Sequence, residues 1–173
     1  MGASGWVSRV DYQPDIAAAL EAARWDAFRA GNFYRSPDEL PHARSMTEDE
    51  FVAWCVEEYG PQADSEEARF MWRAARTEPI DPDSLLASQP YSGTHSVIDM
   101  TAVADAPDYN KVAPVTEETL DAIFATRTPS TDAVATAVAE GRLDLYGRWH
   151  GTYIVGYRND TPDAIFFVGH SGD

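Results

Sequence analysis

Four histidines carry most of the acid–base chemistry that this sequence could perform near neutral pH: His42, His95, His150 and His170. No two of them have the HxH or HExxH spacing of a metal site. The single cysteine, Cys55, has no second cysteine with which to share a metal or form an internal disulfide. We therefore predict no metal and no cofactor.

His95 lies in a segment rich in small polar side chains, residues 92–100 (SGTHSVIDM). It could act as a general base with Asp99 close by. The composition favours a strand over residues 94–100, on which positions 95 and 99 share one face about 13 Å apart. Because that distance excludes direct contact, we favour an inner strand whose hydroxyl groups bond locally.

His150 and His170 lie on the two strands of a predicted hairpin, so the register decides whether they meet. A three-residue loop gives paired residue numbers that sum to 320 and places His150 opposite His170. A two- or four-residue loop gives a sum of 321 and places His150 opposite Ser171. The sequence leaves both registers open.

Residues 170–173 (HSGD) contain the three residue types of a Ser-His-Asp triad. Neighbouring residues on a strand point to opposite faces, and terminal residues tend to fray. We expect no triad there.

The spacing of apolar and capping residues predicts an α+β fold of about five helices packed on a small antiparallel sheet with a C-terminal β-hairpin. Helices are expected from Pro14 to Gly31 and after Thr47, Asp64, Thr116 and Ser130. Thr47 and Glu50 form a capping box.

The sheet should pair 144–157 with 163–170, with 94–100 as a neighbour and a possible strand at 6–10. Loops are expected over 36–45 and 105–114, and mostly over 77–92. Trp54 and Trp72 should be mostly buried between their two helices.

The whole chain, residues 1–173, is interpreted as one domain, helical and acidic over 1–89 and mixed over 90–173. It carries 29 acids and 13 bases, a net charge of −16, and residues 36–89 alone hold 13 acids and four bases. Such charge disfavours nucleic acid and anionic membrane surfaces as partners. With no apolar run of membrane-spanning length and no signal peptide, we expect a cytoplasmic protein of open oligomeric state.

The acidity favours a non-enzymatic binding protein of the immunity, inhibitor or adaptor type that engages a basic protein partner. The expected contact residues are Glu50, Glu57, Glu58, Glu66 and Glu67. Three alternatives stay open: acidity that serves only solubility, a small hydrolase using His95 or the His150/His170 area, and an accessory protein of a bacterial pathway. A pocket that brings two of these side chains within hydrogen-bond reach would favour the enzyme: His95, Asp99, Asp144, His150 and His170. A flat acidic face with exposed aromatic residues would favour the binding protein.

Two segments, 93–100 (GTHSVIDM) and 169–173 (GHSGD), resemble small acidic proteins of actinobacteria whose activity is uncharacterised. The resemblance covers about a dozen residues. It implies a bacterial source and no activity, and it transfers no site residue.

Overall fold

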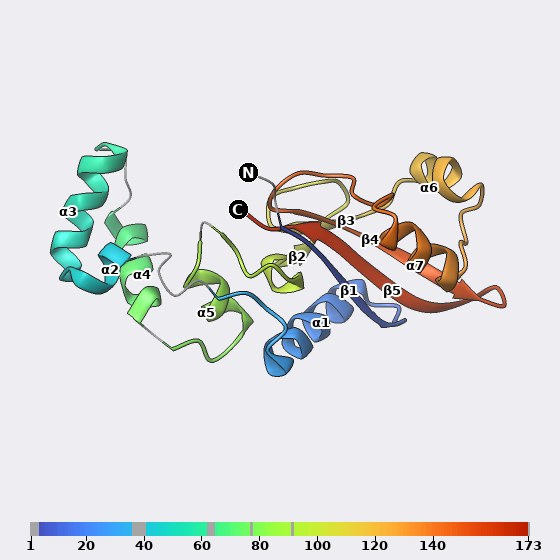
Figure 1. The fold of residues 1–173 in the computed structure, drawn as a ribbon, viewed down its shortest axis with the longest axis horizontal. Helices are drawn as coiled ribbons and strands as arrows, with labels where there is room; N and C mark the ends of the chain where they lie inside the picture. The colour runs from blue at the N-terminus through green and yellow to red at the C-terminus, as the bar shows by residue number, and fades with distance from the viewer. Residues whose placement is uncertain (1–3, 36–40, 62–64, 77, 91, 173) are drawn as a thin grey trace. The chain divides into compact units, whose positions relative to one another are not determined.

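A computed structural model describes residues 4–35, 41–61, 65–76, 78–90 and 92–172 (Figure 1). The chain divides into two compact units. The sheet unit comprises residues 1–34 and 93–173, and the helical unit comprises residues 35–92. The α+β class is confirmed, with seven α-helices and a five-stranded sheet within the described residues.

The sheet is mixed, rather than antiparallel as predicted. Its strand order is β1-β5-β4-β3-β2. β1 (Gly5–Asp11), β5 (Thr161–His170) and β4 (His150–Arg158) are antiparallel neighbours. β3 (Lys111–Pro114) runs parallel to β4, and β2 (Ala102–Val103) runs parallel to β3. β1 confirms the strand expected at residues 6–10 and forms one edge of the sheet.

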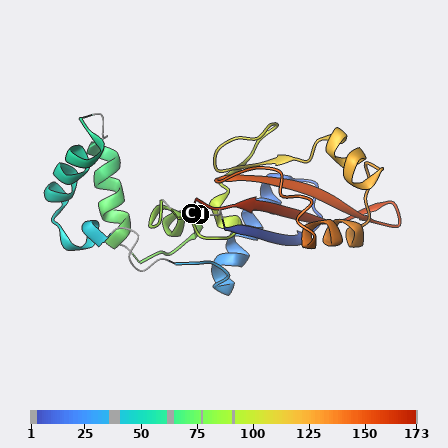
Figure 2. The ribbon, with the colours of Figure 1, turned by 45° about the horizontal axis from the view of Figure 1, so that its top comes forward.

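Helices cover both faces of this sheet (Figure 1, Figure 2). On one face α1 (Ile16–Ala30) buries Leu20 against Trp6 and Phe167. On the other face α6 (Glu117–Phe124) and α7 (Thr131–Ala139) form a second core, which includes Val134 and Phe166. Alternation of side chains along β5 therefore supplies both cores from a single strand.

Local signals explain the helices of the sheet unit. The Asp15 side chain accepts a hydrogen bond from the Ala18 amide at the start of α1, and Gly31 ends the helix at a φ of 69°. Thr116 and Ser130 cap α6 and α7 in the same way. α6 and α7 begin where the sequence predicts, and α1 begins two residues after the predicted Pro14.

The hairpin turns at Asn159 and Asp160, both with positive φ (50° and 59°), as a two-residue type I′ turn requires. A bulge then adds Asp163 to β5, because Gly156 pairs with Ala164 and Tyr157 pairs with Pro162. Beyond the bulge the paired numbers sum to 320. The two-residue loop pairs Arg158 with Thr161, a sum of 319, and the bulge raises the sum to 320. The prediction of 321 for a two-residue loop is therefore wrong.

The strand predicted over 94–100 is wrong. Gly93 and His95 have positive φ (73° and 51°), which an extended strand does not allow, and Val97–Asp99 form a short 3₁₀ helix, η1. The loop predicted over 105–114 contains β3 instead. The strand predicted from residue 144 begins only at His150, because Trp149 also has a positive φ (60°).

The helical unit contains α2 (Pro41–Ser45), α3 (Glu48–Tyr59), α4 (Ser65–Arg76) and α5 (Pro82–Ala87). Part of the predicted 36–45 loop is therefore helical, and residues 36–40 lie outside the described residues. The core of this unit includes Phe51, Cys55 and Ala68. Trp54 and Trp72 are half-buried and pack against that core. Within the described part of the chain, no helix is long and apolar enough to cross a membrane.

Candidate functional site

A buried polar network closes one end of the sheet. Asp99 and Ser171 are fully buried, and the Ser171 hydroxyl donates a hydrogen bond to Oδ2 of Asp99. The Thr94 amide donates to Oδ1 of Asp99 at 2.6 Å, and the Thr94 and Ser96 hydroxyls lie 2.7 Å apart. Because each of these polar groups has a partner, the network is compatible with burial.

The backbone bends sharply around Asp99. Gly93 must lack a side chain, because a Cβ there would lie 2.8 Å from Oδ2 of Asp99. The Asn110 side chain donates to the Asp99 carbonyl at 2.8 Å, and the Asn110 amide donates to the Trp149 carbonyl at 2.7 Å. Asn110 and Trp149 both have positive φ, a conformation that surrounding contacts must hold in place. Asp99 thus holds the turn before it through its carboxylate and the turn at Asn110 through its backbone carbonyl.

Burial raises the pKa of the Asp99 carboxyl above its usual range, against the opposing effect of its hydrogen bonds from Ser171 and Thr94. A raised pKa in a cleft would suggest catalysis. However, Asp99 is sealed from solvent, and neither Asp99 nor Ser171 lines the cavities found beside β1 and α6. We interpret the network as structural.

The candidate histidines lie in three separate environments. His95 stacks on Tyr34 with ring centroids 4.4 Å apart. His170 Nε2 lies 3.2 Å from Oδ1 of Asp144, and His150 Nδ1 lies 2.7 Å from the Arg148 carbonyl. His150 and His170 stand at the end of the 320 register, yet no hydrogen bond joins their rings.

The structure therefore brings together only part of the predicted catalytic set. His170 and Asp144 are within hydrogen-bond reach, but neither lines either cavity. Among the described residues, no group of three or more His, Cys, Asp or Glu side chains is placed to hold a metal ion. Burial raises the pKa of the Cys55 thiol, which disfavours the reactive thiolate.

The expectation that the terminal residues fray is wrong for Ser171. Its amide donates to the Ser4 carbonyl at 3.0 Å and its side chain is fully buried. No local signal in the sequence links Ser171 to Asp99, because the contact depends on the packing of η1 against the end of β5.

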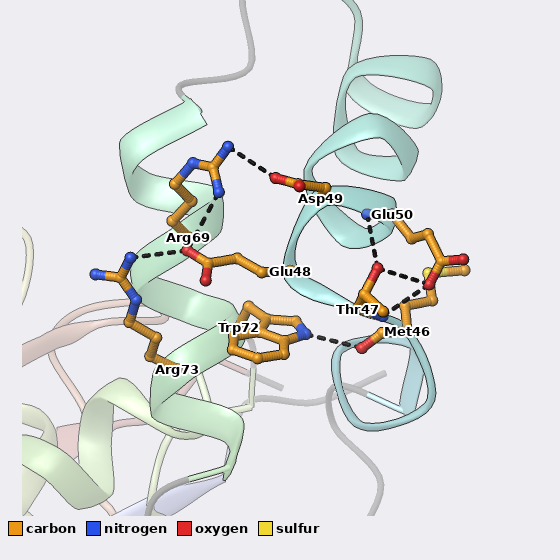
Figure 3. Close-up of polar contacts among 8 residues, drawn as sticks. All are labelled: Met46, Thr47, Glu48, Asp49, Glu50, Arg69, Trp72 and Arg73. Carbon is orange, nitrogen blue, oxygen red and sulfur yellow. Dashed lines mark hydrogen bonds and ion pairs between the residues drawn. The ribbon is translucent and has the colours of Figure 1, made fainter.

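Ion pairs use part of the acidic charge of the helical unit (Figure 3). Glu48 accepts from Arg73 at 2.8 Å and Asp49 accepts from Arg69 at 3.1 Å, which joins α3 to α4. The Glu50 carboxylate completes the predicted capping box with Thr47, at 2.8 Å from both its amide and its hydroxyl. Glu50 is thereby engaged in a local structural role.

The other four predicted contact residues gather at one end of the α3–α4 pair, which we call the acidic end: Glu57, Glu58, Glu66 and Glu67. α4 begins six residues after α3 ends and runs antiparallel to it, so the end of α3 lies near the start of α4 (Figure 1). All four carboxylates belong to exposed residues. Glu57, Glu58 and Glu67 take part in no ion pair with another described residue.

No protein-family model matches the sequence, and neither a curated protein nor a solved structure shows significant similarity to it. The functional argument therefore depends on the site geometry alone.

Proposed function

We propose that the chain is a non-enzymatic binding protein whose acidic end engages a basic segment of another protein. One observation carries the proposal: the last turn of α3 buries none of its four residues, Val56, Glu57, Glu58 and Tyr59. A turn that buries none of its side chains, yet keeps apolar and acidic side chains together, has the composition of a contact surface.

The position of Glu57 and Glu58 strengthens this argument. A helix C-terminus carries partial negative charge, so each carboxylate there costs about 0.3–1 kcal/mol at low ionic strength. The last turn of α3 holds no basic residue to offset this repulsion. A lysine or arginine of a partner would relieve it, and would leave the Glu50 cap and the Glu48 ion pairs intact.

Exposed apolar side chains supply the second part of the surface. Val56 is 38% exposed, Tyr59 is 50% exposed and Phe70 of α4 is 58% exposed. Tyrosine and phenylalanine at a surface rimmed by charge are common contact residues of protein interfaces. The carboxylates would speed encounter with a basic partner and the aromatic residues would slow its release.

The hydrolase alternative has one contact in its favour, the pairing of His170 with Asp144. The Asp144 side chain of that pair is exposed, but neither side chain lines the cavity beside β1 or the cavity beside α6, so neither cavity would hold a substrate against the pair. Asp99, the other predicted acid, is fully buried. The acidic end is therefore the better supported site.

The test compares the native chain with a Glu57→Gln/Glu58→Gln variant. Each is immobilised, a partner is captured from a lysate of the source organism with the native chain, and the purified partner's association rate is measured at 0.1 M and 1 M salt. The screening length falls from about 10 Å to about 3 Å over this range. We expect the native chain to lose association rate steeply with salt, and the variant to associate severalfold more slowly at low salt.

A matched control removes two exposed acids of the sheet unit, Glu118→Gln and Asp160→Asn. It has the same net charge as the test variant but retains the acidic end. If control and test variant associate at the same rate, only total charge matters, and the acidic end is not the site.

A further inference from the structure

A cavity of about 380 Å³ lies alongside β1, the edge strand of the sheet. Its walls are residues 6–10 of β1, one side of α1 and residues 95–97. This volume lies within the range of ligand-binding pockets. All of its lining residues belong to the sheet unit, so the cavity is separate from the acidic end.

Along its outer edge, β1 has backbone groups that pair with no other described strand. At the two ends of β1, the Ser171 amide donates to the Ser4 carbonyl and the Tyr12 amide donates to the Asp163 carbonyl. The even-numbered residues of β1 therefore direct their N–H and C=O groups toward β5. In an antiparallel pair the orientation alternates, so the odd-numbered residues direct their N–H and C=O groups away from the sheet. These residues are Gly5, Val7, Arg9 and Asp11, and all four are exposed.

Small side chains of α1 leave space beneath this strand edge. Ala23, Ala27 and Ala30 present methyl groups to the cavity, and Asp26 of the same helix also lines it. Val97 lines the same space from η1. Trp6, another lining residue, is 6% exposed.

We propose that β1 and this cavity bind an extended peptide segment of a partner protein by strand addition. The peptide backbone pairs with the outward groups of Val7 and Arg9, and every second side chain enters the cavity beside α1. A free strand edge next to a side-chain-sized cavity supplies both the affinity and the specificity of this binding mode.

Charge identifies the class of occupant. The sheet unit holds sixteen acids and eight bases, so two copies pairing edge to edge would bring like charges together. Asp11 at the end of β1 and Asp26 at the cavity rim outnumber the one base there, Arg9, which favours a neutral or basic segment. We therefore assign the site to a peptide segment of another protein, neutral or basic, in which every second residue is apolar. A second copy of this chain is the less favourable occupant.

The probe is a phage-displayed library of random twelve-residue peptides, selected on the full chain, and the test variant is Val7→Pro. Proline removes the outward amide, and it leaves the β1–β5 hydrogen bonds intact because the Val7 amide does not belong to them. The matched control is Val7→Ala, which keeps the amide. We expect selected peptides to bind the native chain and Val7→Ala within about twofold, and Val7→Pro at least tenfold more weakly.

Two further measurements keep the test decisive if Val7→Pro folds poorly. Bound peptide should slow hydrogen exchange of the Val7 and Arg9 amides, and Ala27→Leu, which fills the cavity from α1, should weaken binding without altering β1. The Glu57→Gln/Glu58→Gln variant should bind the peptides normally, which separates this site from the acidic end. If no peptide is enriched, or if the enriched peptides bind Val7→Pro and Ala27→Leu as tightly as the native chain, the proposal is overturned.

Discussion

Asp99 and Ser171 lie 72 residues apart in the chain and meet as one hydrogen-bonded pair in the interior of the sheet unit. Ser171 also pairs its amide with Ser4, so this single residue connects η1, β1 and the end of β5. The bond from Ser171 to Ser4 therefore links the two chain segments that form the sheet unit, and the bond to Asp99 ties η1 to the same point.

Ser171→Ala should lower the free energy of unfolding by about 1–3 kcal/mol, because it removes one partner of a buried carboxylate. Urea denaturation followed by circular dichroism measures this loss. Thr128→Ala, a similar deletion at an exposed loop residue, should change stability by less than about 0.5 kcal/mol. Equal stability of both variants would show that the Asp99–Ser171 bond contributes nothing.

The raised pKa of Asp99 predicts a pH dependence of stability. Between the ordinary aspartate pKa of about 3.9 and the raised value, the folded chain binds more protons at this site than the unfolded chain does. Its contribution is therefore fully present at low pH and declines as pH rises. The stability of the native chain relative to Asp99→Asn should fall between pH 4 and pH 7; a difference that grows over this range would contradict the assignment.

Asp163 should show the opposite sign. The Arg158 guanidinium hydrogen-bonds to this carboxylate at 3.1 Å and the Thr131 hydroxyl does so at 2.7 Å, and both lower its pKa. Its contribution is present above the unfolded pKa and lost as pH falls through the folded value. Asp163→Asn should therefore be less stable than the native chain at pH 7 and approach it near pH 3, as thermal unfolding at the two pH values can measure.

Elements specified by neighbouring residues are predictable from the sequence. α1 begins at the Asp15 cap and ends at Gly31, and α3 begins at the capping box, all signals within four residues of the helix end. The α+β class and the hairpin follow from similar local patterns. These positions depend on hydrogen bonds that each segment makes with itself.

Elements specified by distant contacts are not predictable in this way. Residues 94–100 have strand composition, but the bond between Asp99 and Ser171 and the close approach of Gly93 impose a turn. β3 is only four residues long and contains Pro114, so its parallel pairing with β4 leaves no periodic signal. The hairpin register depends on the bulge at Asp163, which sequence spacing does not reveal.

The helical unit should depend more on Phe51 than on Trp72. Phe51 is fully buried, so Phe51→Ala should cost about 3–5 kcal/mol. Trp72 is half-buried and its indole donates to the Met46 carbonyl at 2.9 Å, so Trp72→Phe should cost about 0.5–1.5 kcal/mol. Urea titrations of both variants test the order; a Trp72→Phe loss equal to that of Phe51→Ala would show that the tryptophan is a core residue.

The last prediction separates the acidic end from an ordinary stabilising surface. If Glu57 and Glu58 serve binding rather than folding, they should reduce the stability of α3. Both carboxylates lie at the negative end of the helix dipole, in a turn that holds no basic residue. Glu57→Gln/Glu58→Gln should then raise the unfolding free energy by a few tenths to about 1 kcal/mol at low ionic strength, and the gain should shrink in 1 M salt. Glu66→Gln/Glu67→Gln provides the matched control, because these two acids lie in the first turn of α4, where negative charge is favourable. That variant should lose stability under the same conditions. Urea denaturation at 0.05 M and 1 M salt measures both changes, and a loss of stability in the Glu57→Gln/Glu58→Gln chain would mean that these carboxylates support the fold and need no partner to explain them.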